Sequence, residues 1–269
     1  MTWERRAGDA VHALAVVVPV HDEEALLPRC LAALEHAVAE VTAGRSATGA
    51  QVDGDSGGDP GPGLAVHVVL VLDDCSDGSA QIAAASPFTT LAVAARSVGL
   101  ARAHGVEAVL DALGLAGAEG DDLAGTWIAS TDADSAVPAG WLTEQLRLAT
   151  SGTDLMIGTV RPDRADLSDA QWAAWSGRYT PGRPNGHVHG ANLGIRADVY
   201  RRAGGYAPLA EHEDVDLVAR ARAAGARVTA SDDCSVLTSG RPVGRTPGGY
   251  ARYLREDLVP QATRSLPVA

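Results

Sequence analysis

Asp132 and Asp134, two aspartates separated by one alanine, are the residues of this chain best suited in type and spacing to metal chemistry. They follow an apolar run that begins at Trp127 and is typical of a buried strand. In an extended chain, side chains two positions apart point the same way, so the two carboxylates can be presented together. Mg²⁺ typically binds one or two carboxylates together with substrate phosphates, and Mn²⁺ has similar preferences. The pair predicts a metal–diphosphate site, although an isolated Asp-x-Asp more often forms a solvated acidic turn.

The chain has three further acidic sites, at Asp22, at Asp73 and Asp74, and at Glu213 and Asp214. Each follows a predicted strand or opens a predicted helix. If the strands before the first two sites and before the Asp-x-Asp are parallel neighbours, these acids converge at the C-terminal edge of the sheet, where open α/β sheets bind ligands. The last site also suits a plain helix N-terminus, because acids there favour the helix dipole.

Strands alternate with helices along the chain, which predicts an α/β fold with a mainly parallel central sheet flanked by helices. The apolar runs predict strands at 11–20, 64–72, 91–95, 127–129, 155–160 and 227–231, with a strand or turn at 189–196. Apolar spacing and capping residues predict helices at 27–41, 80–85, 99–113, 138–148, 197–203, 215–224 and 249–259.

Two segments lack a regular apolar pattern. Residues 42–63 are rich in Gly, Asp, Ser and Pro, which predicts a flexible surface insertion. Residues 161–185 hold Trp172, Trp175 and Tyr179. If these rings are exposed they would stack on an acceptor, and if buried they are core.

Composition excludes several classes of function. The net charge of −12 over 269 residues argues against a nucleic-acid-binding protein, which needs a basic face. Anionic substrates must instead be held by local arginines, a metal or helix N-termini. The three cysteines show no metal-ligand spacing, and no run reaches the roughly 20 apolar residues that span a bilayer. We expect a cytoplasmic protein without an integral membrane segment, with peripheral association at the inner face of the membrane as the alternative.

Neither a Gly-x-Gly-x-x-Gly after the first predicted strand nor a Gly-Lys-Ser/Thr occurs, which disfavours a Rossmann oxidoreductase and a P-loop NTPase. Five motifs occur instead in order along the chain, at Val16–Glu24, Leu72–Ser79, Thr131–Asp134, Gly190–Asn192 and Glu213–Leu217. Together they resemble the family 2 inverting glycosyltransferases of GT-A fold. The resemblance extends over roughly residues 11–245.

The resemblance implies roles on the donor side of the site. A nucleotide would be bound by Pro19, Val20, His21, Glu23, Asp74, Arg96 and Asp132. Mn²⁺ or Mg²⁺ would be held by Asp134 with Asp132. Arg241 and Arg245 would meet the diphosphate. His189 or His212 would complete the metal shell, or have only a polar or capping role.

On the acceptor side, the resemblance implies that Asp214 is the general base, assisted by Glu213. The acceptor region would include Gly190, Ala191, Asn192, Trp172 and Trp175.

The implied enzyme is a metal-dependent, inverting glycosyltransferase of the hexosyltransferase type. It would move one sugar from a nucleotide-diphosphate sugar to a hydroxyl of a small-molecule or lipid-linked acceptor. The Gln-x-x-Arg-Trp motif of processive synthases is absent, so we expect non-processive transfer. His21-Asp22 and Val98 depart from the usual Tyr-Asn and Asn of the family. The alternatives are a nucleotidyltransferase of related fold and a non-catalytic nucleotide-sugar-binding protein.

The same resemblance predicts one GT-A domain over residues 1–269. Its nucleotide-binding half would be about 11–135 and its acceptor-binding half about 136–245. The C-terminal helix and tail would occupy about 246–269.

Overall fold

Strand β1 (Ala13–Val20) lies inside a sheet of eight strands in the computed structural model, which describes residues 10–49, 63–184, 186–246 and 248–259. The strand order across this part of the chain is β3-β2-β1-β4-β7-β6-β8-β5. The other strands are β2 (Ala65–Asp73), β3 (Thr89–Val93), β4 (Thr126–Ser130), β5 (Ser135–Ala136), β6 (Leu155–Pro162), β7 (Leu193–Arg196) and β8 (Val228–Thr238).

The strands that carry the first three acidic sites are parallel neighbours, as predicted. β1 pairs in parallel with β2 and with β4, so that Val20 lies opposite Leu72 and Val17 lies opposite Ser130. Their C-terminal ends therefore meet at one edge of the sheet. β7 runs antiparallel to both β4 and β6, so the sheet is mostly but not entirely parallel.

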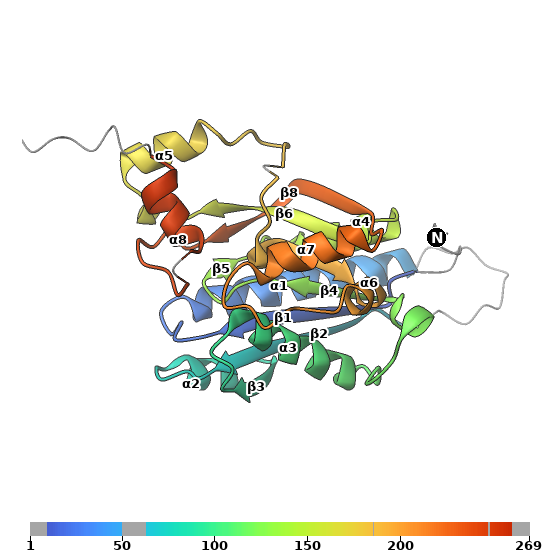
Figure 1. The fold of residues 1–269 in the computed structure, drawn as a ribbon. Coiled ribbons are helices and arrows are strands. Elements are labelled where there is room, and N and C mark those ends of the chain that lie inside the picture. Colours follow the sequence, from blue (N-terminus) through green and yellow to red (C-terminus); the bar gives the residue numbers. More distant parts are fainter. Residues whose placement is uncertain (1–9, 50–62, 185, 247, 260–269) are drawn as a thin grey trace, which may run out of the picture.

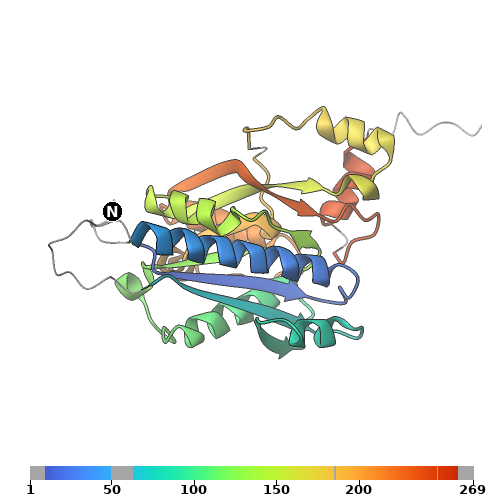
Figure 2. The same ribbon diagram turned by 180° about the vertical axis from the view of Figure 1, so that it is seen from behind.

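Both faces of β1 are buried, which explains why its sequence is apolar without alternation. Val16 and Val18 belong to a core cluster that includes Leu34. Val17 belongs to a second cluster on the other face, with Val106. Helices cover both faces (Figures 1 and 2), namely α1 (Leu27–Gly49) and α4 (Trp141–Thr150) on the first, and α3 (Val98–Ala112), α6 (Ala197–Arg202) and α7 (Glu213–Ala223) on the second. Shorter helical segments are α2 (Ser79–Ala84), η1 (Gly120–Leu123), η2 (Arg164–Asp166) and η3 (Gly190–Asn192).

The predicted insertion at 42–63 begins too early. Helix α1 continues to Gly49, beyond the last residue of its apolar pattern. The Thr42 hydroxyl donates to the carbonyl oxygens of Val38 (2.8 Å) and Ala39 (3.0 Å), which lets a polar side chain stay within the helix. The rest of that prediction, from 50 to 62, lies outside the described residues.

The segment 161–185 is more regular than its apolar pattern predicted, because it contains helix α5 (Asp169–Ser176). A capping box opens this helix: the backbone N–H of Gln171 donates to Ser168 Oγ (3.3 Å), and the backbone N–H of Ser168 donates to Gln171 Oε1 (3.0 Å). Ser-x-x-Gln is a sequence signature of a helix start, so the signal was present.

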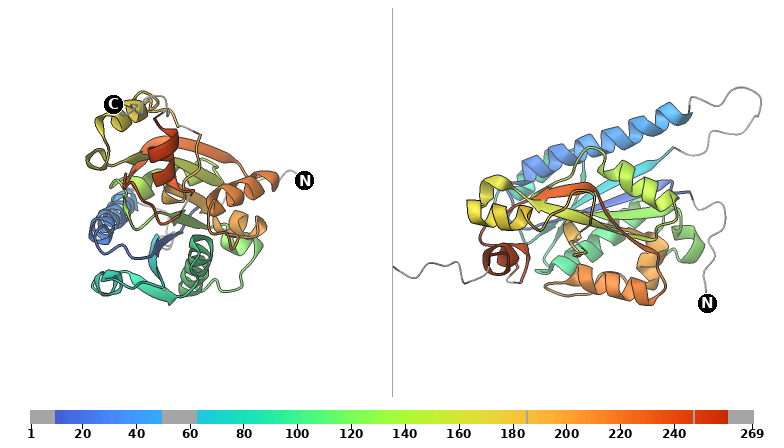
Figure 3. Two further views of the ribbon diagram at one scale, coloured as in Figure 1. Left: turned by 60° about the vertical axis from the view of Figure 1, so that its left-hand side comes forward. Right: turned by 90° about the horizontal axis from the view of Figure 1, so that it is seen from above.

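Helix α5 packs against the C-terminal helical segment, which consists of α8 (Tyr250–Arg252) and the π-helix η4 (Tyr253–Asp257) in place of the one longer helix expected at 249–259. The two lie side by side at one end of the molecule (Figures 1 and 3). Leu167, Trp175, Leu254 and Leu258 form a small core between them. In the part of the chain that the structure describes, no helix combines the length and hydrophobicity that crossing a bilayer requires.

Strand β8 is longer than predicted, because a polar residue at its centre forms hydrogen bonds with residues distant in the sequence. Asp232 accepts hydrogen bonds from the Tyr179 hydroxyl (2.9 Å) and the Gly182 N–H (2.8 Å), and only 8% of it is exposed. The extra residues carry Thr238 to the edge of the sheet where the acidic sites meet.

Candidate active site

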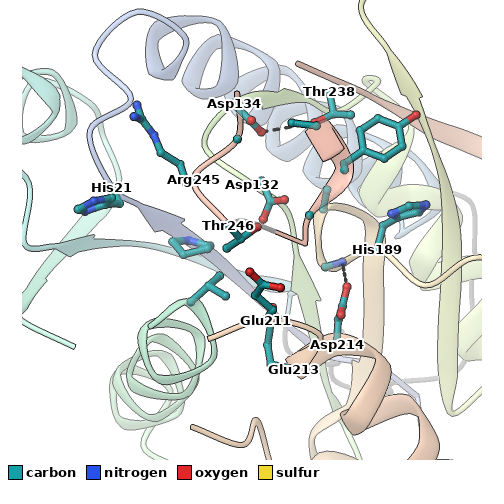
Figure 4. A pocket seen from close by; sticks show the side chains of 18 of the residues that line it. His21, Asp132, Asp134, His189, Glu211, Glu213, Asp214, Thr238, Arg245 and Thr246 are labelled. Carbon is teal, nitrogen blue, oxygen red and sulfur yellow. Dashed lines mark hydrogen bonds between the residues drawn. The ribbon is translucent and has the colours of Figure 1, made fainter. Parts of the chain in front are cut away.

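A cavity of about 830 Å³ lies at the C-terminal edge of β1, β2 and β4, within the size range of small-molecule sites (Figure 4). It is lined by most of the predicted site residues, namely Pro19, Val20, His21, Glu23, Asp74, Arg96, Asp132, Asp134, Trp175, Gly190, Ala191, Glu213, Asp214, Arg241 and Arg245. The ends of the strands bring the acids that follow β1, β2 and β4 to the cavity. The N-terminus of α7 brings Glu213 and Asp214 to the same cavity. Residues separated by about 80 positions, Asp134 and Asp214, therefore share one site.

The side chain of Asp73 shapes one side of the cavity by binding the backbone of the loop after β3. Its buried carboxylate accepts hydrogen bonds from the N–H groups of Ala95 (2.7 Å), Arg96 (2.9 Å) and Ser97 (3.1 Å). This arrangement fixes the turn on which Arg96 projects, and Arg96 Nε donates to Asp74 Oδ2 (2.7 Å). The family-like Asp-Asp pair thus has two functions, since Asp73 shapes the loop and Asp74 faces the cavity.

The residues that depart from the family pattern tie the first two turns together. His21 Nδ1 donates to the carbonyl oxygen of Asp73 (2.7 Å). Asp22 accepts from the backbone N–H of Ser76 (2.7 Å), and this bond is the main reason that the pKa of Asp22 is lowered. The His-Asp pair therefore joins the end of β1 to the end of β2.

Backbone strain is concentrated around the cavity. The non-glycine residues with positive φ in the described part of the chain are Asp22, Asp74, Arg96 and His212, with φ between 49° and 61°. Three of them line the cavity, and Asp22 adjoins His21, which also lines it. Such conformations are costly and cluster at functional sites, so they support this cavity as the functional one.

The Asp-x-Asp lies in a turn and not in the extended chain that its spacing predicts, yet both carboxylates face the cavity. Asp134 Oδ1 accepts from Ser135 Oγ (3.2 Å) and Thr238 Oγ1 (3.4 Å), and Asp134 Oδ2 lies 3.0 Å from the guanidinium of Arg241. Burial, reinforced by the charge of Asp132, raises the pKa of Asp134 to about 6. Burial also raises the pKa of Asp132, against the opposing effect of Arg102.

This donor set fits Mg²⁺ or Mn²⁺ when substrate phosphates supply further ligands. Two neighbouring carboxylates whose pKa values are raised gain from an added cation, and their hard oxygens suit both ions. Among the described residues, no group of three or more His, Cys, Asp or Glu is arranged to hold a metal ion. A third ligand from His189 or His212 therefore has no support, and the remaining coordination would come from substrate oxygens and water.

Arg102 is the site residue that the sequence analysis missed. It is only 2% exposed, its Nε donates to Ser130 Oγ (3.0 Å), and its two terminal nitrogens contact Asp132 and Glu213. One signal was available, because Arg102 occupies the same helical face as Val106 and Val109. A charge on a buried face requires a partner.

Glu213 and Asp214 have different surroundings. Glu213 is 4% exposed and paired with Arg102, and burial raises the pKa of its carboxyl. Asp214 faces the cavity and accepts a hydrogen bond from the N–H of Gly190 through Oδ2 (2.6 Å) (Figure 4). Asp214 is therefore the more accessible of the two for taking a proton from a bound molecule.

Two arginines from the loop after β8 reach across to Glu23. The Arg241 guanidinium donates to Glu23 Oε2 (2.9 Å), and Arg245 Nε donates to Glu23 Oε1 (3.2 Å). Arg241 also pairs with Asp134, as described above. This brings two cations next to the Asp-x-Asp, where an anionic group of a ligand would be stabilised.

The predicted acceptor-side residues divide into two groups. Gly190, Ala191 and Trp175 line the cavity, whereas Trp172 and Asn192 do not. Asn192 is fully buried, where its Nδ2 donates to the carbonyl oxygens of Thr159 and Cys234 (2.9 Å each). Its placement is that of a core residue.

The aromatic segment that contains Trp172 packs internally. Trp172 stacks on Trp175 at 5.4 Å, which in turn stacks on Tyr179 at 4.8 Å. Only Trp175 of these three rings borders the cavity. The rings that join it there are His189, which the sequence analysis named only as a candidate metal ligand, and His187, Tyr250 and Tyr253, which it did not name.

Comparison with known proteins identifies the family and the fold. The model of the family described as glycosyl transferase family 2 matches residues 15–201. The comparison with curated protein sequences found no match.

Solved structures with similar folds include two glycosyltransferases. TarS 1–349 of S. aureus in complex with UDP-GlcNAc has a TM-score of 0.57 and 12% identity, over 88% of this chain and 61% of that one. The mannosyltransferase PcManGT from Pyrobaculum calidifontis, in complex with GDP-Man and Mn²⁺, has a TM-score of 0.50 and 18% identity, over 87% and 58%. This chain thus spans about three fifths of the length of each. At this identity, the likeness is one of fold.

The family model covers well over half of the chain, and the α/β architecture with its mostly parallel sheet agrees with it. The chain therefore belongs to glycosyl transferase family 2 and has the GT-A fold.

Proposed function

We propose that this enzyme is a metal-dependent, inverting glycosyltransferase that moves one sugar from a nucleotide-diphosphate sugar to a hydroxyl acceptor without processive elongation. The observation that carries the proposal is that Asp134 and Asp214 line one cavity of about 830 Å³. A carboxylate suited to a metal–diphosphate and a carboxylate suited to proton abstraction are the two groups that such a transfer needs.

The donor would lie along the edge formed by β1 and β2. Val20 and His21 would border the nucleoside, and the Asp74–Arg96 pair offers both an acceptor and donors to a base edge. The bound UDP-GlcNAc of TarS and GDP-Man of PcManGT support a nucleotide sugar as the donor class. Neither complex identifies the base or the sugar of the donor that this chain would bind.

The diphosphate would lie between the Asp-x-Asp and the loop after β8. Asp134 and Asp132 would hold Mn²⁺ or Mg²⁺, which would supply positive charge against the charge that develops on the leaving diphosphate. The Mn²⁺ in the PcManGT complex supports this assignment. Arg241 and Arg245 would exchange part of their contact with Glu23 for phosphate oxygens, adding charge-assisted hydrogen bonds.

Asp214 would act as the general base. Its carboxylate faces the cavity and is oriented by the Gly190 N–H, so it can accept the proton of an acceptor hydroxyl as that oxygen attacks the sugar. Attack on the face opposite the leaving diphosphate inverts the anomeric centre. Glu213, held by Arg102, would position the start of α7 and with it Asp214.

Hydrolysis of nucleotide sugars tests the proposal without knowledge of the acceptor. With Mn²⁺, slow release of free sugar from UDP- or GDP-sugars is expected, and excess chelator should abolish it. Pyrophosphate-dependent exchange of the nucleotide would mark the nucleotidyltransferase alternative. Binding of a nucleotide sugar without any turnover would instead indicate a non-catalytic binding protein. A cytoplasmic location is part of this proposal, because nucleotide sugars would be supplied there.

A further inference from the structure

The arginines that line the cavity are all engaged on its donor side or behind it. Arg96 pairs with Asp74, Arg241 with Glu23 and Asp134, Arg245 with Glu23, and Arg102 with Asp132 and Glu213. Every one of these carboxylates except Glu213 belongs to the proposed nucleotide or metal site. Positive charge is therefore concentrated where the donor phosphates would lie.

Two further carboxylates that line the cavity have no arginine partner of this kind. Glu211 accepts from the N–H of Gly248 (3.0 Å), and Asp214 accepts from the N–H of Gly190 (2.6 Å). Throughout the described residues, neither carboxylate forms an ion pair with an arginine, while both line the cavity. A negatively charged group that entered here would meet like charge, and the cation nearest to Asp214, Arg102, is already paired with Asp132 and Glu213.

Near Asp214 the cavity is lined by four rings, His187, His189, Tyr250 and Tyr253, which we call the ring wall. Tyr250 and Tyr253 are stacked at 5.8 Å, His189 meets Tyr250 edge-on at 5.5 Å, and His187 lies 6.2 Å from Tyr253. All four line the cavity. Burial lowers the pKa of His189 to about 4, so its ring carries no charge at neutral pH.

We propose that the acceptor is an uncharged, glycoside-like hydroxyl compound, which presents a ring face to the ring wall and carries no negative charge next to the reacting hydroxyl. This rests on the proposed function, which makes Asp214 the base and this side the acceptor side. Aromatic side chains favour flat apolar faces, while a second anion beside Glu211 and Asp214 is disfavoured by several kcal/mol when like charges are juxtaposed. Acceptors whose phosphate adjoins the reacting hydroxyl are therefore excluded.

A matched pair of probes separates charge from shape. Phenyl β-D-glucoside and phenyl β-D-glucuronide share the two rings and differ in one carboxylate. Saturation-transfer NMR on the full chain with Mg²⁺, with and without UDP or GDP, gives their affinities. We expect the glucoside to bind at least about tenfold more tightly than the glucuronide, and Tyr250→Leu to weaken it by a similar factor.

Equal or tighter binding of the glucuronide would overturn the proposal, as would the absence of glucoside binding. The result does not depend on nucleotide, so failure to bind any UDP- or GDP-sugar would count against the proposed function alone.

A positive charge added at Val215 tests whether charge selects the acceptor. It lies next to Asp214, lines the cavity and is 44% exposed, so a longer side chain fits with little strain. Val215→Arg should tighten glucuronide binding several-fold, whereas the matched variant Val215→Gln should not. Equal effects of the two variants would show that charge does not select the acceptor.

Discussion

The guanidinium of Arg102 on α3 and the carboxylate of Glu213 on α7 form a buried ion pair beside the cavity. Their side chains are only 3% and 5% exposed. Because Arg102 also contacts Asp132, one buried cation joins the Asp-x-Asp turn to the Glu-Asp helix start. The geometry of the site therefore depends on a residue that neither acidic motif contains.

Replacement of Arg102 should be far more costly than replacement of an exposed arginine. Arg102→Met leaves the buried carboxylate of Glu213 without its cation, and breaking such a pair typically costs about 3–5 kcal/mol. The control Arg201→Met removes the more exposed pair with Glu107, for which less than about 1 kcal/mol is expected. Urea unfolding measures both. Similar losses for the two variants would contradict the structural role of Arg102.

Loss of Asp134 should remove the metal-dependent part of nucleotide affinity. Asp134→Asn keeps the size of the side chain but removes the charge that a divalent ion requires, so adding Mn²⁺ should no longer improve binding. Asp233→Asn is the control, since Asp233 is largely exposed and does not line the cavity. Calorimetry with UDP and GDP, with and without Mn²⁺, makes the comparison. An undiminished response to Mn²⁺ in Asp134→Asn would refute the metal site.

The loop arginines should recognise phosphate and not the base. Arg241→Ala and Arg245→Ala are each expected to weaken binding of a nucleoside diphosphate by about tenfold, the effect of losing a charge-assisted contact, and to leave binding of the nucleoside nearly unchanged. Arg252→Ala serves as the control, because Arg252 is exposed and pairs with Glu256 one turn later. Equal losses for diphosphate and nucleoside would argue against this role.

His189 should make stability depend on pH. Burial lowers its pKa from 6.5 to about 4, so between these values the unfolded chain binds a proton that the folded chain does not. The contribution of His189 to stability is therefore lost as the pH falls from about 6.5 towards 4, and it is constant above that range. His189→Gln removes this dependence.

The difference in unfolding free energy between wild type and His189→Gln should shift in favour of the variant by about 2 kcal/mol between pH 7.5 and 4.5. Denaturant unfolding across that range measures it, with the plateau above pH 7 as the internal reference. A difference that stays constant down to pH 4.5 would mean that the ring is not desolvated in the folded protein.

Much of the fold followed from local pattern. The unbroken valine run of β1 predicted a strand buried on both faces, and the acids after β1, β2 and β4 predicted one ligand edge, because parallel neighbours end together. What local pattern could not supply were contacts between distant residues. Arg102 and Glu213 are 111 positions apart, and Tyr250 joins the cavity only because α8 packs beside α5.

Some residues were predicted wrongly because their contacts with distant residues could not be read from local sequence. Asn192 lies in a family-like motif beside residues that line the cavity, yet its amide is used by the core, including the Trp141 indole N–H (2.9 Å). The polar residues 232–235 gave no strand pattern for the second half of β8, because the groups that bind the buried Asp232 lie some 50 positions earlier in the chain. The capping box of α5, in contrast, could be predicted from the sequence.

If Asp134 and Asp214 have separate roles in one metal–nucleotide-sugar site, replacement of Asp214 should lower turnover and leave donor binding intact. Asp214→Asn should bind the nucleotide sugar in the presence of Mn²⁺ with an affinity within about twofold of wild type. Its rate of sugar release or transfer should fall by about 10²–10⁴-fold, the usual contribution of general base catalysis. Turnover within tenfold of wild type at unchanged donor affinity would show that Asp214 is not the base and would contradict the account.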